Sequence, residues 1–82
     1  MSVNKIHERR RQMYNREMLK AKMKDSGMTV KAIAEKSGFI RETFYNRIEN
    51  GDFRASEIQR ITETLRLTRD ERDAIFFATE VN

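Results

Sequence analysis

Apolar residues recur along most of this chain at the spacing of one face of an α-helix. Three groups show it: Val30, Ile33 and Ala34; Phe44 and Ile48; and Ile58, Ile61 and Leu65. Residues three and four positions apart lie on the same side of a helix, so each group can form a buried stripe. Alternating β-branched segments, the pattern of strands, are absent. The pattern predicts an all-α fold without strands.

Glycines and capping residues suggest where the helices begin and end. The chain has no proline, and Gly27, Gly38 and Gly51 stand where left-handed helix ends are expected. Thr29 is a candidate N-cap, and Thr68 with Glu71 has the spacing of a capping box. We therefore expect five helices: one from about Asn4 or Lys5 to Asp25, one from Thr29 to Ser37, one from Arg41 to about Asn50, one opening at Arg54-Ala55-Ser56, and one from Thr68 through Ala78.

The first expected helix is long for so small a chain, and only its last part has a continuous apolar face, formed by Met18, Leu19 and Met23. Farther upstream, Met13 and Tyr14 stand among arginines. This difference predicts two parts, a basic N-terminal extension over residues 1–18 and a globular domain over residues 19–82.

The expected core follows from the same helical stripes. We expect these residues to be buried: Leu19, Met23, Met28, Ile33, Phe39, Phe44, Ile48, Ile58, Ile61 and Leu65. Ile75, Phe76 and Phe77 are three consecutive large residues that cannot all point inward from one helix. All three are candidate contacts for a second copy of the chain, and we expect one of them to remain available for it.

Composition excludes several classes of protein. With 82 residues the chain is expected to form one domain with little room for an internal active site. It has no cysteine and a single histidine, His7, which rules out a disulfide scaffold, a zinc ribbon and a thiol enzyme. No nucleophile–base pair or phosphate-binding glycine loop is visible, and no apolar run could span a membrane. We expect a cytoplasmic protein that is not an enzyme and uses no cofactor or metal.

The net charge is +4 and the sequence pI is about 9.8. Residues 1–28 hold eight basic and three acidic residues, residues 29–53 four of each, and residues 54–82 five basic and six acidic. Lysines and arginines that bind a nucleic-acid backbone release condensed counterions, which favours binding. A basic segment therefore indicates a polyanionic partner. A merely solvated arginine-rich surface is the alternative.

The run VKAIAEKSGFIRETFY, residues 30–45, resembles the helix-turn-helix of the Cro/repressor family of phage and prophage regulators. Ala34, Gly38 and Phe39 occupy the places of the family's helix-crossing alanine, its turn glycine and the apolar residue after it. The resemblance extends over about residues 19–78 and implies a five-helix DNA-binding domain. Two positions depart from the family pattern: Ile40 and Arg54 stand where serine or threonine usually caps a helix.

The resemblance implies a binding site on the third helix and at the start of the second. Its base-reading positions fall on Arg41, Glu42, Tyr45 and Asn46. Arginine can pair with guanine, a carboxylate with the cytosine amino group, and asparagine with adenine, whereas tyrosine can touch a thymine methyl or a phosphate. Expected contacts to the DNA backbone are Thr29, Val30, Lys31, Arg47 and Asn50. For each of these polar residues, a solvated helix face is the alternative.

The N-terminal extension offers Arg9, Arg10 and Arg11 as an arm that could follow phosphates or enter a minor groove. It could equally be a solvated helix, or a contact with another subunit or with a different protein.

Two functions follow. The first is a sequence-specific double-stranded DNA-binding transcriptional regulator, a phage or prophage repressor that acts as a homodimer. The second is a protein-interaction module with the same fold, such as an antirepressor or a partner of a phage or host protein. Four acidic residues near the presumed DNA face keep the second hypothesis open: Glu35, Glu42, Glu49 and Asp52.

Overall fold

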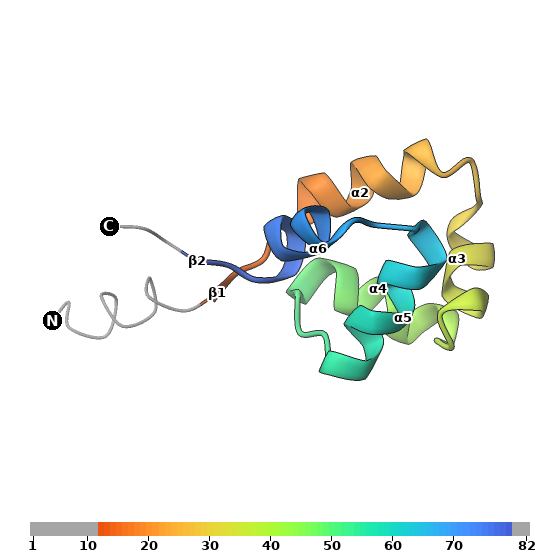
Figure 1. Cartoon of the computed structure of the whole chain (residues 1–82). Helices are drawn as coiled ribbons and strands as arrows, with labels where there is room; N and C mark the ends of the chain where they lie inside the picture. The colour runs from red at the N-terminus through yellow and green to blue at the C-terminus, as the bar shows by residue number, and fades with distance from the viewer. Residues whose placement is uncertain (1–11, 80–82) are drawn as a thin grey trace, which may run out of the picture.

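A computed structural model describes residues 12–79, and its helices pack around one core (Figure 1). In chain order the elements are β1 (Gln12–Met13), α2 (Arg16–Asp25), α3 (Val30–Lys36), α4 (Arg41–Asn50), α5 (Ala55–Leu65), α6 (Arg69–Phe76) and β2 (Ala78–Thr79). The all-α fold class is confirmed, although the structure adds two strands of two residues each that the sequence did not predict. The expected bounds of the second and third helices are confirmed as well.

Side-chain caps explain where three of the helices begin. The carboxamide oxygen of Asn15 accepts a hydrogen bond from the backbone N–H of Met18 at 3.0 Å, and the hydroxyl of Thr29 accepts from Ala32 at the same distance. Thr68 and Glu71 form the reciprocal capping box that their spacing predicts. Each cap satisfies a backbone donor that the helix itself leaves unpaired.

The predicted start of the first helix is wrong. Asn15 leaves helical geometry to cap α2, and Gln12 and Met13 before it form β1, which pairs antiparallel with β2. Ala78, expected in the last helix, belongs to β2, and α6 ends at Phe76. A strand of two residues is too short to show an alternating pattern, which explains why the sequence did not reveal it. The earlier part of the expected helix lies outside the described residues.

Eight of the ten residues expected in the core are buried, and Ile75 and Phe76 join them. Its buried residues are Leu19, Met23, Ile33, Ala34, Phe39, Phe44, Ile48, Ile58, Ile61, Ile75 and Phe76. Met28 and Leu65, expected to be buried, are half-buried and pack against this cluster. Tyr14 and Met18, which the sequence analysis placed in the N-terminal extension, also pack against it. The chain therefore contributes to the core from upstream of Leu19.

Gly51 ends α4 in the left-handed region with φ +72° and lies directly against Tyr14. A Cβ atom at position 51 would overlap the Tyr14 ring. That ring packs 5.8 Å from Phe53 and 6.3 Å from Phe76, measured between ring centroids. Gly51 thus lets the segment before α2 close over the end of α4.

Candidate nucleic-acid interface

The turn between α3 and α4 fixes the angle at which α4 leaves the core. Gly38 adopts φ +79°, and the next N–H, that of Phe39, donates to the carbonyl of Ala34 at 2.8 Å. Ala34 is buried where the helices meet, and the Phe39 ring lies 5.1 Å from the Phe44 ring. These contacts hold the N-terminal end of α4 at the surface in a defined orientation.

The four predicted base-reading residues share one exposed face within residues 41–46, which we call the first half of α4; residues 47–50 are its second half. Arg41, Glu42, Tyr45 and Asn46 are all exposed, and their spacing of one, four and five positions places them on the same side of the helix. The Arg41 guanidinium lies 5.8 Å from the centre of the Tyr45 ring, within reach of a cation–π contact. No ion pair involves Arg41 or Glu42 within residues 12–79. Their polar groups are thus available to a ligand.

Arg47, expected to contact the DNA backbone, is instead engaged inside the protein. Its Nε donates to Glu57 Oε1 at 3.0 Å and its Nη2 donates to Glu57 Oε2 at 3.3 Å. This hydrogen bond raises the pKa of Arg47 above its usual range. The paired geometry ties α4 to the first turn of α5, so the guanidinium of Arg47 serves the fold.

Glu57 is a buried carboxylate that sequence reasoning missed. Burial alone would raise its pKa, but hydrogen bonds from Arg47 and from the backbone N–H of Arg54 outweigh burial, and the pKa lies below its usual range. Arg54 has no acceptor atom with which to cap α5. The Glu57 carboxylate compensates by binding the Arg54 N–H at 2.8 Å. A glutamate three residues after the expected cap was the sequence signal.

Glu49 was counted among the acidic residues that argue against DNA binding, yet its charge is compensated. Arg16 Nη1 donates to Glu49 Oε1 at 2.7 Å, and Lys20 Nζ lies 3.8 Å from Glu49 Oε2. Both cations come from α2, and this pairing could not be seen in the sequence because it joins residues far apart. Glu35, Glu42 and Asp52 remain exposed and form no ion pair in the part of the chain that the structure describes.

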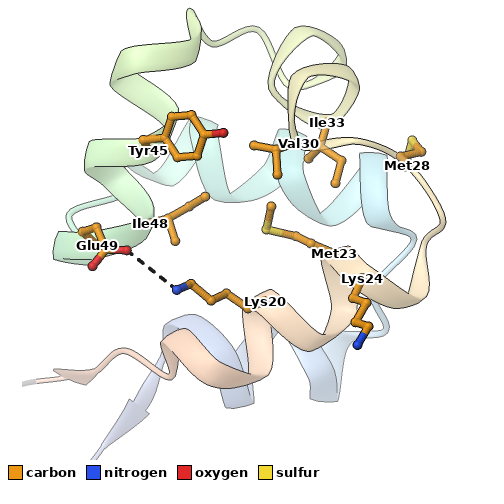
Figure 2. Close-up of a pocket in the computed structure, with 9 residues that line it drawn as sticks. All are labelled: Lys20, Met23, Lys24, Met28, Val30, Ile33, Tyr45, Ile48 and Glu49. Atoms are coloured by element: carbon orange, nitrogen blue, oxygen red, sulfur yellow. Dashed lines mark ion pairs between the residues drawn. The ribbon is translucent and has the colours of Figure 1, made fainter.

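A groove of about 310 Å³ separates α2 from the start of α3 and from α4 (Figure 2). Its lining residues are Lys20, Met23, Lys24, Met28, Val30, Ile33, Tyr45, Ile48 and Glu49. The floor is apolar, Lys20 reaches across to Glu49, and Lys24 points away from the other lining residues. Tyr45 forms a wall of this groove and contributes to the exposed face of α4 at the same time.

The residues at the start of α3 that are expected to contact the DNA backbone present different groups to it. Thr29 and Lys31 are exposed, whereas Val30 is half-buried along the groove. The Thr29 hydroxyl is occupied as the cap of α3. Lys31 therefore offers a charged group, and Val30 offers its backbone N–H. Asn50 is exposed at the far end of α4.

The structure corrects the expected dimer contact. Ile75 and Phe76 are buried in the core, and only Phe77 keeps an exposed ring, at 38%. Phe77 borders a shallow depression of about 370 Å³ whose other lining residues are Ala55, Ile58, Gln59, Thr62, Glu63 and Arg72. The guanidinium of Arg72 lies 5.6 Å from the centre of the Phe77 ring.

Other types of site find no support in residues 12–79. No group of His, Cys, Asp and Glu side chains in this range could hold a metal ion. None of the described helices combines the length and apolarity needed to cross a bilayer. The expected arm, Arg9, Arg10 and Arg11, lies outside the described residues.

Comparison with known proteins gives the family. No curated protein and no solved structure matches the chain. A family model described as helix-turn-helix matches residues 19–72, which include α3, the Gly38 turn and α4. This match covers more than half of the chain and the same segment whose geometry is given above. The chain therefore belongs to the helix-turn-helix family of DNA-binding transcription regulators.

Proposed function

We propose that this protein recognises a specific sequence in double-stranded DNA by placing the first half of α4 in the major groove. The observation that carries the proposal is the exposed face formed by Arg41, Glu42, Tyr45 and Asn46, whose charged members form no ion pair with any residue from 12 to 79. The major groove admits one α-helix, and residues near the N-terminal end of that helix reach the base edges.

The chemistry of each side chain assigns a role. Arg41 can donate two hydrogen bonds to guanine, Asn46 can pair with adenine, and Glu42 can accept from the cytosine amino group. Tyr45 can touch a thymine methyl with its ring or a phosphate with its hydroxyl. Lys31 and the N–H of Val30 are the phosphate contacts that hold the helix in register.

We propose repression as the regulatory outcome. A small domain that occupies a promoter excludes the polymerase by its volume alone, whereas activation requires a further surface that contacts the polymerase. The resemblance of residues 30–45 to phage and prophage regulators supports the same choice and suggests a phage or prophage origin.

We propose that two copies bind together through the depression beside Phe77. A twofold dimer would present two α4 helices to half-sites about 34 Å apart, one turn of the duplex. Replacing Phe77 with serine should lower the dimer fraction in sedimentation and weaken binding to a two-half-site duplex more than to a single half-site. A wild-type chain that stays monomeric at high concentration and on DNA would reject the dimer.

The arm formed by Arg9, Arg10 and Arg11 is proposed to add phosphate contacts. Each phosphate contact contributes about 0.9 to the slope of log affinity against log salt. Changing all three arginines to glutamine should therefore flatten this slope and leave the preferred sequence unchanged. The triple substitution is a better test than deleting residues 2–16, because a deletion would also remove Tyr14, which packs against the core, and Asn15, which caps α2. An unchanged slope would reject the arm.

Selection of binding sites from a random duplex pool tests the proposed function. At about 150 mM salt, near physiological ionic strength, the chain should enrich a defined motif, and its affinity should fall steeply as salt rises. A folded chain that enriches no motif would reject sequence-specific binding and favour the protein-interaction module. The exposed acidic residues Glu35, Glu42 and Asp52 are the feature that such a module would use.

A further inference from the structure

Ile40 is the most exposed large hydrophobic residue in the described part of the chain, at 72%. It stands at the N-cap of α4 with extended backbone (φ −78°, ψ 152°) and directly precedes Arg41. The neighbouring apolar residue, Phe39, is buried in the core. The side chain of Ile40 thus contributes little to folding and faces outward from the end of α4.

Isoleucine at this position also leaves the helix without a side-chain cap. Asn15, Thr29 and Thr68 each accept a hydrogen bond from the backbone N–H of the third residue of their helix. The side chain of Ile40 has no acceptor, and no side chain of the described residues caps α4. A serine or threonine here would stabilise the helix. A residue that is unfavourable both as a cap and as an exposed side chain is best explained by a binding role.

We propose that Ile40 reads the 5-methyl group of a thymine and is a specificity-determining residue of this protein. The inference rests on the proposed function, in which the N-terminal end of α4 enters the major groove. Of the groups that base pairs present there, the thymine methyl is the apolar one. A branched aliphatic side chain with no donor or acceptor can select it and can form no hydrogen bond to any other base edge.

We expect this thymine to lie beside the base that Arg41 reads, because Ile40 and Arg41 are consecutive residues. Consecutive Cα atoms lie about 3.8 Å apart, and neighbouring bases on one strand are separated by about 3.4 Å. The motif should therefore contain a thymine one step from the base contacted by Arg41.

Parallel site selection with the wild type and the Ile40→Ser variant is the first part of the test. The wild type should enrich a motif with one thymine per half-site that the variant no longer prefers, while the rest of the motif stays the same. Ile40→Val is the matched control, because it keeps branched methyl groups and should keep the thymine.

Replacing each thymine of the selected site with deoxyuridine is the second part, since this removes the methyl group alone. At one position the wild type should lose affinity about fourfold, the value for burial of one methyl-sized group. The Ile40→Ser variant should bind both duplexes equally. Its Tm should be equal to or above that of the wild type, because serine can accept the N–H of Thr43.

The outcomes are distinguishable. If no motif is enriched, the proposed function fails and this inference fails with it. If a motif is enriched but deoxyuridine affects wild type and Ile40→Ser equally at every thymine, the inference is wrong and the proposed function stands. A lower Tm for Ile40→Ser would also contradict the inference, because it would show that isoleucine serves the fold.

Discussion

Helix α4 carries polar and charged side chains along its whole length, but the fold surrounds its two halves differently. In the first half, Arg41 and Glu42 have no ion-pair partner among the described residues. In the second half, Arg47 is held by Glu57, and Glu49 by Arg16 and Lys20. Two arginines on one helix therefore differ in their surroundings: Arg47 has a carboxylate partner, whereas Arg41 has none among residues 12–79.

The two halves of α4 also differ in how firmly they are tied to the rest of the fold. Ion pairs and hydrogen bonds join the second half of α4 to α2 and to α5, so this half is an anchor. Phe44 and Ile48 bury the opposite side of the helix. Under the proposed function, we expect substitutions at the exposed positions of the first half to change DNA binding with little loss of stability.

The largest expected effect is on the anchored end of α4. Replacing Gly51 with alanine should cost about 1–2 kcal/mol for the left-handed backbone and about 1–3 kcal/mol for overlap with the Tyr14 ring. Gly27→Ala is the matched control, since Gly27 has φ +75° and nothing within 4 Å of the added carbon. Chemical denaturation of both variants measures the difference. Equal losses would show that Tyr14 does not pack tightly on Gly51.

The next largest effect distinguishes Arg41 from Arg47, because one substitution should affect DNA binding and the other stability. Arg41→Ala should lower affinity for the selected site by about 1–3 kcal/mol, the usual value of one bidentate base contact, and leave Tm unchanged. Arg47→Ala should lower Tm, because it leaves the buried Glu57 without its partner, and should keep the same preferred sequence. Binding isotherms and thermal unfolding of both variants measure these effects. The reverse outcome would contradict the division of α4 into two halves.

The smallest expected effect is a loss of stability at low pH. The pKa of Glu71 is lowered chiefly by the hydrogen bond from Lys22, and the pKa of Glu57 is also lowered. Each carboxylate thus contributes stability that is present above its ordinary pKa, about 4.3, and is lost as pH falls through the lowered value. The free energy of unfolding should decrease below about pH 4.5, and less steeply in Glu57→Gln and Glu71→Gln. Variants with the wild-type pH dependence would contradict this assignment.

Local signals predicted much of this fold. The stripes of Ile33 and Ile58, the caps at Thr29 and Thr68, and the glycine turn at Gly38 each depend on residues close in sequence, and the structure confirms them. The start of α2 was predicted wrongly because the pairing of β1 with β2 joins residues from opposite ends of the chain.

In the candidate site too, features that depend on neighbouring residues could be predicted, and contacts between distant residues could not. The exposure of Arg41 and Asn46 follows from helical spacing and could be predicted. The engagement of Arg47 by Glu57 and of Glu49 by Arg16 depends on how the helices pack, so charge type alone could not reveal either ion pair. The burial of Ile75 and Phe76 could not be predicted either, because a run of three apolar residues does not show which one faces outward.

The most direct test of the central claim is a titration of the isotope-labelled chain with a duplex that contains the selected site, followed through amide and side-chain chemical shifts. We expect the largest changes at Ile40, Arg41, Glu42, Tyr45 and Asn46, with further changes at Lys31. The side-chain signals of Arg47 and Glu57 should keep their chemical shifts. Changes concentrated on α5 and α6, with the first half of α4 unaffected, would contradict the claim that this half of the helix reads DNA.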